Sequence, residues 1–276
     1  MASLEQLKKK FKSVELTKQL TGAMKTVSSA KYSRVSKAYT ACKIYTAELE
    51  KLAPYCSGIE LSKENSKHKK KDLFVIIGHN RGLCGAYNSE LHSFATSVLS
   101  ENPDCTLIVC GKNAIAYFEG KKTEFEKFIL GDVTEYLSCK PLINKMIELY
   151  RTGKVKSVNV IYQEFVNTLT QRPHTVQVLP LDALDNKQNS EDMLFIPDKE
   201  SVSEDLEIKV IASKIYKIIL EAAIGAQAAT LLAMKTAVDH ATEIADMLEN
   251  EIHKKRQSSV TNGVIETGAA SYSEED

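Results

Sequence analysis

The side chains with the most capacity for chemistry stand in the segment GHNRGLCGA at residues 78–86. It carries a thiol at Cys84, an imidazole at His79 and three glycines. Glycines between a strand and a helix could cradle a phosphate, because free N–H groups at a helix start point at the anion. The spacing, however, fits neither GxGxxG nor GxxxxGK[ST]. We therefore favour a tight strand-to-helix turn, with glycine supplying a positive φ, over a nucleotide site.

Cys84 could act as a nucleophile, but only His79, five residues before it, offers local support. A small residue in a tight loop is the better interpretation. The histidines form no HExxH pattern, and the acidic residues are scattered over helix faces and loops, so no pair of carboxylates suits acid–base work. The sequence therefore predicts no catalytic residue, no cofactor and no metal site.

The composition indicates a soluble, foldable chain. Hydrophobic residues make up 43% and charged residues 26%, and the formal net charge is zero, which argues against a general nucleic-acid binder. Six cysteines, at positions 42, 56, 84, 105, 110 and 139, include no CxxC pair and are expected to be reduced thiols. The N-terminus lacks an apolar signal core, and no apolar run approaches the ~20 residues of a membrane span, so the protein is expected to be soluble or peripheral.

The elements that position these residues form three parts. Residues 1–55 are expected to be a long helix, residues 72–200 an α/β domain, and residues 204–267 a second long helical part. A polar linker is expected at 56–71. A run of lysines on the first helix is either a solvated face or a cationic stripe for an acidic partner, and both interpretations stay open: Lys8, Lys9, Lys10, Lys12, Lys18, Lys25 and Lys31.

The middle part alternates between strand and helix patterns. Strands are predicted at 72–77, 106–110, 157–162 and 175–180, helices at 89–99 and 143–150, and a surface loop at 184–192. Gly78 and Gly111 each follow a strand. This alternation predicts a central sheet.

The C-terminal part carries a heptad seam with spacings of three and four. We expect it to face the N-terminal helix, in an antiparallel pair whose backbones approach closely at the small residues. Gly225 is unfavourable in a helix and would be tolerated where a bulky neighbour needs the space. The seam consists of Ile208, Ile211, Ile215, Ile218, Ala222, Gly225, Ala229 and Leu232.

Four segments resemble the gamma subunits of rotary F-type ATP synthases. LTGAMKTVSSAK (20–31) is similar to their N-terminal signature, and HNRGLCGAYN (79–88) to their central loop. AQAATLLAMKTAVDHA (226–241) and KRQSSVT (255–261) resemble their C-terminal signatures. The four segments stand in register over nearly the whole chain.

The resemblance implies an antiparallel coiled coil of the terminal helices with an inserted Rossmann-like α/β domain. It implies a non-catalytic shaft inside a ring of three alpha and three beta subunits, with epsilon and the c-ring as further partners and no nucleic acid. Met24, Lys25, Arg256 and Gln257 match positions that face the beta subunits. The structural loop matches at Arg81, Gly82, Cys84 and Gly85.

The chain also departs from the family pattern. Gly225 and Ala226 replace a usual Ser-Glu pair, Thr230 replaces Arg and His240 replaces Asn. The departures fit either a divergent lineage or the shaft of a specialised ATP-hydrolysing motor, and an unrelated coiled-coil adaptor or an enzyme using Cys84 are the rival hypotheses. The expected location is the cytoplasmic side of a bacterial plasma membrane, peripherally attached; the alternative is the matrix side of the mitochondrial inner membrane.

Overall fold

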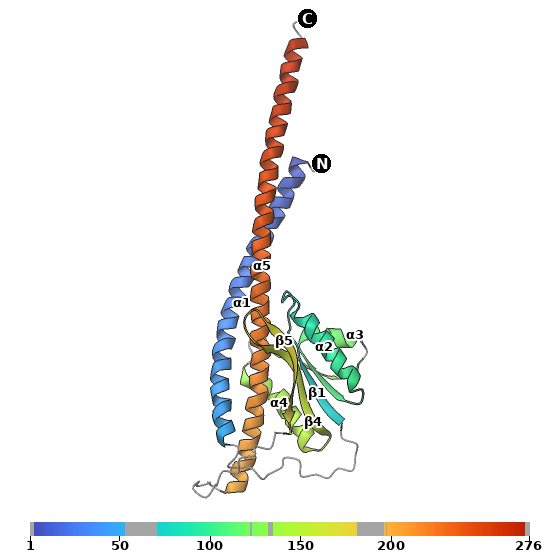
Figure 1. The fold of residues 1–276 in the computed structure, drawn as a ribbon, viewed down its shortest axis with the longest axis vertical. Coiled ribbons are helices and arrows are strands. Elements are labelled where there is room, and N and C mark those ends of the chain that lie inside the picture. The colour runs from blue at the N-terminus through green and yellow to red at the C-terminus, as the bar shows by residue number, and fades with distance from the viewer. Residues whose placement is uncertain are drawn as a thin grey trace. The chain divides into compact units, whose positions relative to one another are not determined.

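The computed structural model describes residues 3–52, 71–121, 123–131, 135–180, 196 and 198–273. Nearly all of the predicted linker at 56–71, the whole predicted loop at 184–192 and Cys56 lie outside these residues. The chain divides into two compact units, residues 28–232 and residues 1–27 with 233–276. Helix α1 (Leu4–Leu52) and helix α5 (Lys199–Ser273) contribute residues to both units (Figure 1).

A five-stranded sheet forms the centre of residues 28–232, with the strand order β3-β2-β1-β4-β5. The strands are β1 (Lys71–Ile77), β2 (Thr106–Cys110), β3 (Glu126–Phe128), β4 (Val155–Phe165) and β5 (Gln171–Leu179). All neighbours are parallel except β4 and β5, which form an antiparallel pair. Pro173 is tolerated in β5 because an edge strand has one row of N–H groups with no ladder partner.

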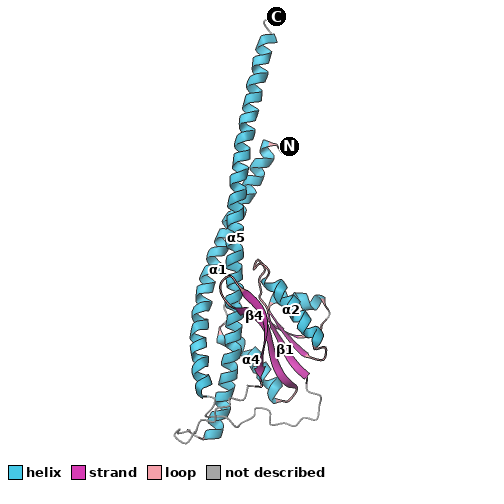
Figure 2. Cartoon of the chain, in the orientation of Figure 1, coloured by secondary structure: helices cyan, strands magenta, loops and turns pink. Residues whose placement is uncertain are grey.

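Helices lie on both faces of the sheet (Figure 2), and the central strands β1 and β2 are accordingly buried and apolar on both sides. Phe74 and Ile76 of β1 pack with α2 (Tyr87–Glu101) and α3 (Lys112–Gly120). Leu73 and Val75 point to the opposite face, where they pack with α4 (Tyr136–Arg151) and α5. The predicted α/β architecture is confirmed, whereas α3 and the three-residue β3 were not predicted.

Helix α4 begins earlier than predicted. Its expected start lay after Pro141, but the helix runs from Tyr136 with that proline inside it. A proline so near the start removes only one backbone hydrogen bond, the one to the carbonyl of Leu137. Burial of Cys139, Leu142 and other residues of α4 against the sheet offsets this loss.

The heptad seam of α5 has a different partner from the one predicted. Ile211, Ile215 and Ile218 pack against the sheet and α4, not against α1. Helix α1 instead contacts another face of α5, where Leu220 and Ile224 are buried. Spacings of three and four identify an apolar face of a helix, but a sheet can cover that face as well as a second helix can.

The antiparallel pairing of α1 and α5 is present within residues 28–232. The Cys42 Sγ lies 3.9 Å from the carbonyl oxygen of Ser213, and Val35 packs in the same cluster as Leu220 and Ile224. Because the sheet covers one side of α5 and α1 covers another, the stretch of α5 from about residue 210 to 230 is buried on several sides. Part of α5 is consequently long and apolar enough to cross a membrane by length and composition, but 67% of that window is buried inside the protein.

The second unit consists of the remaining parts of the same two helices. Leu7 is 3% exposed and Ala245 is 3% exposed. Two lone helices would leave such side chains open to water, so the helices cover one another in this unit.

Candidate functional site

The turn after β1 and the turn after β2 are in direct backbone contact at Gly78 and Gly111. The N–H of Gly78 donates to the carbonyl of Cys110 at 2.9 Å. Gly111 has a φ of 93°, and a Cβ there would collide with the carbonyl of Gly78. A Cβ on Gly78 would in turn lie 2.7 Å from the Cβ of Ala114. The two glycines that follow the predicted strands are thus required by close approach.

Asn80 connects this contact between the two turns to α3 and to the segment after β3. Its Nδ2 donates to the carbonyl oxygen of Leu130, and its Oδ1 accepts a hydrogen bond of 3.1 Å from the N–H of Lys112 at the start of α3. The side chain thereby links the end of β1, the start of α3 and the segment after β3. It holds the first part of the loop that continues through Arg81, Gly82, Leu83 and Gly85 to α2.

The loop turns through two left-handed positions. Gly85 has a φ of 61°, as the tight-turn interpretation predicts, but Gly82 does not have a positive φ. The second left-handed residue is Leu83, at 62°, and its side chain is 60% exposed. A non-glycine residue in this conformation costs about 1–2 kcal/mol. The sequence gives no sign of this strain, since leucine rarely adopts such a φ.

Cys84 packs inward from the loop. It is 3% exposed, its Sγ lies 3.8 Å from the carbonyl oxygen of Arg81, and Asn88 Nδ2 donates to it at 3.2 Å. Burial raises the pKa of this thiol. Because a nucleophilic cysteine needs the thiolate and access to substrate, this environment favours the packing role over the rival enzyme hypothesis.

Helix α2 begins at Tyr87, whose side chain reaches α5. Its hydroxyl donates to the carbonyl oxygen of Ala222 at 2.7 Å, and its ring is buried with Cys84, Ala226 and Ala229. The main-chain carbonyl of Tyr87 accepts a hydrogen bond of 2.9 Å from the Nε2 of Gln163. Sequence reasoning missed this tyrosine, because its partner Ala222 is 135 positions away.

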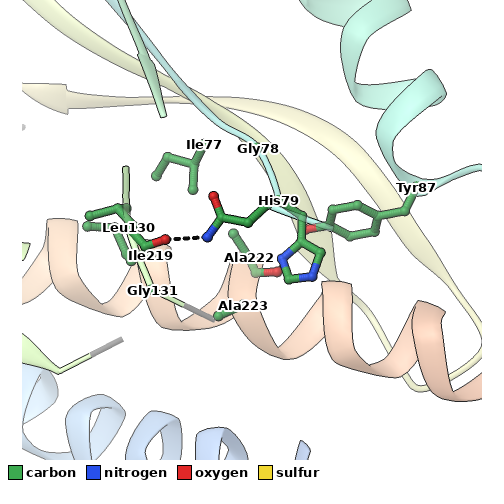
Figure 3. A pocket seen from close by; sticks show the side chains of 10 residues that line it. Ile77, Gly78, His79, Tyr87, Leu130, Gly131, Ile219, Ala222 and Ala223 are labelled. Atoms are coloured by element: carbon green, nitrogen blue, oxygen red, sulfur yellow. Dashed lines mark hydrogen bonds between the residues drawn. The ribbon is translucent and has the colours of Figure 1, made fainter. Parts of the chain in front are cut away.

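A small cavity lies at the carboxyl end of β1 (Figure 3). Open α/β sheets take ligands outside the carboxyl ends of their strands, where the strand order reverses, and here it reverses at β1. The cavity is only about 20 Å³, and Ile219, Ala222 and Ala223 of α5 form part of its lining. This volume holds about one water molecule, whereas ligand pockets span about 300–1,000 Å³.

The other predicted site residues lie in the second unit. Met24 and Lys25 are half-buried on α1, while Arg256 and Gln257 are exposed on α5. Around the structural loop, the carbonyl oxygen of Arg81 lies near both the Sγ of Cys84 and the Nδ2 of Asn88 at the start of α2, so these three residues are brought together.

The cysteines of the described segments are all free thiols. Cys42, Cys84, Cys110 and Cys139 are buried, while Cys105 is half-buried. Burial raises the pKa of Cys139 to about 12 and raises that of Cys110 further. In the same described segments, no group of three or more His, Cys, Asp and Glu side chains is arranged to hold a metal ion.

Comparison with known proteins covers nearly the whole chain. Residues 3–271 match the family model described as ATP synthase. The ATP synthase gamma chain of Glaesserella parasuis is 30% identical over 287 residues, covering 98% of this chain and 99% of that protein. That of Staphylococcus epidermidis is also 30% identical, covering 96% and 97%.

Solved structures share the fold. The rotor of the Euglena gracilis mitochondrial ATP synthase is 17% identical, with a TM-score of 0.64 over 93% of this chain and 98% of that one. A chain of the OSCP/F1/c-ring structure from the same organism gives 0.66 at 18% identity, over 98% and 94%. Three observations point to one family: the four sequence motifs, the α/β domain between two long helices, and the match along residues 3–271. The chain belongs to the ATP synthase gamma chain family.

Proposed function

We propose that this chain is the central rotor shaft of a rotary ATP synthase. It couples proton-driven rotation of a membrane ring to conformational change at catalytic sites on the alpha and beta subunits. The observation that carries the proposal is the family match over residues 3–271, which spans both long helices and the α/β domain. The alternatives, an unrelated coiled-coil adaptor and the shaft of a specialised ATP-hydrolysing motor, predict different partners or a different direction of coupling.

The mechanism needs asymmetry and stiffness rather than catalytic groups. A rotor can shift a catalytic site between states only through contacts that differ between those states. Two packed helices resist bending better than one, so the α1–α5 pair suits torque transmission. The chain itself is non-catalytic in this proposal, which the buried Cys84 thiol and the small volume of the cavity at the end of β1 support.

The proposal assigns a role to each part of the chain. Residues 1–55 and 204–267 form the coiled-coil shaft, and residues 72–200 form the α/β domain. Met24, Lys25, Arg256 and Gln257 contact the beta subunits. The two cationic side chains suit charge-assisted hydrogen bonds to acidic loops.

The partners follow from the same reasoning. The shaft stands in a ring of three alpha and three beta subunits, with epsilon and the c-ring as further contacts, and binds no nucleic acid. The chain itself is peripherally attached to the cytoplasmic side of a bacterial plasma membrane, or to the matrix side of a mitochondrial inner membrane.

Isolation of the native complex tests the proposal. A tag on this chain should recover alpha and beta subunits at three copies of each per copy of the chain, as counted by native mass spectrometry. Recovery without those subunits would exclude the shaft and favour the adaptor. Reconstitution in vesicles with an imposed proton gradient then separates a synthase, which makes ATP, from a motor that only hydrolyses it.

A further inference from the structure

We propose that Glu221 of α5 is a positioning residue that holds the tip of the β4–β5 hairpin on the two long helices, and that this contact takes up a proton when it closes. The hairpin tip is residues 162–174, the part of β4 and β5 beyond the parallel strands together with the turn between them. The contact lies within one chain. Its tests therefore need no partner subunit, and their outcome is independent of the proposed shaft function.

The hairpin tip projects past the parallel strands. The ladder between β1 and β4 ends at Ile161 of β4. The ladder between β4 and β5 continues beyond this residue, to Phe165 opposite Gln171. A hairpin of two strands is marginally stable in water when nothing packs against it. The tip therefore depends on contacts outside the sheet for its position.

Phe165, the last residue of β4, contacts both long helices. Its ring lies 6.4 Å from that of Tyr32 on α1, centroid to centroid, and packs against the cluster in which Leu220 of α5 is buried. Its N–H donates to Glu221 Oε1 at 3.3 Å. Glu221 is 9% exposed, and a second hydrogen bond links its side chain to that of Tyr162. Apolar contacts are non-directional, so these two bonds fix where the tip lies on α5.

Glu221 lies where a negative charge is poorly solvated. Burial raises the pKa of this carboxyl, and the neighbouring Glu164 adds to the shift. The hydrogen bonds from Phe165 and Tyr162 oppose the shift without cancelling it, as does the positive charge of Lys217. Burial also raises the pKa of the surrounding tyrosines, so their hydroxyls stay protonated near neutral pH: Tyr39 of α1, Tyr87 of α2 and Tyr162 of β4.

Opening of the hairpin tip lets water reach Glu221, so the pKa of this carboxyl returns towards its ordinary value of about 4.3. The closed tip therefore keeps a proton that the open tip releases. The contribution of this proton to closing is complete below about pH 4.3 and is lost as the pH rises through the raised pKa of the closed state. Acidification should hold the tip closed, and a rise in pH should loosen it.

Amide hydrogen exchange on the purified full chain tests this pH dependence. Protection factors corrected for intrinsic exchange should fall at residues 163–171 between pH 5 and pH 8, relative to residues 72–77 of β1, which report opening of the sheet. Glu221→Gln cannot titrate, so the fall should disappear. Glu164→Gln should retain it, because Glu221 still titrates in that variant. No fall in the unsubstituted chain, a fall that persists in Glu221→Gln, or its loss in Glu164→Gln would overturn the proton uptake.

Glu221→Leu tests the positioning role. Leucine keeps apolar volume on α5 but offers no acceptor to the N–H of Phe165. At pH 5 it should lower the protection of residues 163–171 by about fivefold relative to β1, the equivalent of about 1 kcal/mol for one hydrogen bond. Glu221→Gln supplies an acceptor again and should restore most of the loss. Full protection in Glu221→Leu, or protection in Glu221→Gln as low as in Glu221→Leu, would overturn the role.

Tyr162→Phe is a milder test that does not depend on the folding of Glu221→Leu. It removes one hydrogen bond to Glu221 and leaves the ring in place. Protection of residues 163–171 at pH 5 should fall by about two- to tenfold relative to β1. Tyr117→Phe removes a hydroxyl from α3 and is the control, which should leave this protection unchanged. Equal protection in Tyr162→Phe and the unsubstituted chain, or equal losses in both tyrosine variants, would overturn the role.

Discussion

Gly111 and Gly82 are both loop glycines, but their surroundings are opposite. A side chain at Gly111 would meet the carbonyl of Gly78 and would require a φ of 93°. Gly111→Ala should therefore lower the free energy of unfolding by about 2–4 kcal/mol, from backbone strain and overpacking together. Urea denaturation of the purified chain measures this change.

Gly82→Ala is the matched control. Nothing lies within 4 Å of a Cβ at this position, and its φ is not positive. The free energy of unfolding should stay within about 1 kcal/mol of the unsubstituted chain or rise slightly, since alanine restricts the unfolded state. A similar loss of unfolding free energy at both glycines would contradict the close contact between the turns after β1 and β2.

The structural role of some single residues can be predicted from the sequence next to them, whereas the role of others cannot. The need for glycine at Gly78 and Gly111 was predictable, because a strand followed by Gly marks a turn, and the positive φ of Gly85 was expected of a tight strand-to-helix turn. The strain at Leu83 and the bond from Tyr87 to Ala222 were not predictable. They depend on tertiary contacts between segments far apart in the sequence.

At the scale of elements, α5 has two apolar faces with separate partners. Ile215 has no exposed surface and packs on the sheet, while Leu220 is 1% exposed and packs on α1. Truncation of either residue to alanine should cost about 2–5 kcal/mol. The two variants should differ in hydrogen exchange, with Ile215→Ala loosening β1, β4 and α4 and Leu220→Ala loosening α1.

Ile244→Ala provides the comparison for these two substitutions. This isoleucine lies on α5 but is 43% exposed, so its truncation should cost clearly less than either buried change. If Ile215→Ala instead loosened α1 as its main effect, the seam would face the helix after all.

The first turns of α5 also contain a carboxyl that is poorly solvated. Burial raises the pKa of Glu207 to about 7, Arg151 opposes the shift, and Glu204 adds to it. The folded chain then keeps a proton that the unfolded chain releases near its ordinary pKa of about 4.3. Stability from this group is therefore complete below about pH 4.3 and is lost as the pH rises to about 7.

Glu207→Gln removes this loss. Its melting temperature relative to the unsubstituted chain should rise steadily between pH 4.5 and 7.5, as measured by circular dichroism. Glu251→Gln, at an exposed glutamate of the same helix, should give a constant difference. Parallel curves for Glu207→Gln would show that this carboxyl is not desolvated.

Periodicity in the sequence predicts which face of a helix is apolar better than it predicts which element packs against that face. The two terminal helices and four of the strands carry clear patterns in the sequence. The partner of the heptad seam did not follow from its spacing, because an open sheet face buries the same isoleucines. The start of α4 was obscured by Pro141, whose local cost is outweighed by burial.

At the scale of the whole molecule, two of the proposed contacts of the shaft, Arg256 and Gln257, lie on exposed helix surface. Arg256→Ala should reduce ATP synthesis by the reconstituted complex by about tenfold or more, as expected for a charge-assisted contact of about 1.5–3 kcal/mol. The free energy of unfolding of the chain should change by less than about 0.5 kcal/mol, since the side chain is exposed.

Lys254→Ala separates a specific contact from a loss of positive charge. Residue 254 is exposed, and two positions along a helix turn the side chain by about 200°. This variant should retain synthesis. Equal loss in both variants would indicate general electrostatics rather than a contact at Arg256.

Family membership was the most predictable property of the whole molecule, because four motifs in register depend on the sequence alone. The match along residues 3–271 confirms it. The packing of α5 beside the carboxyl end of β1 could not be predicted, since it depends on contacts between residues far apart in the chain.

The buried thiols provide built-in reporters of unfolding. Cys42 lies in the α1–α5 contact, Cys84 beneath the loop, and Cys139 between the sheet and α4. An alkylating reagent reaches each of them only when its surroundings open. Variants that retain one of these thiols would reveal, by their labelling rates, the order in which the layers of residues 28–232 come apart.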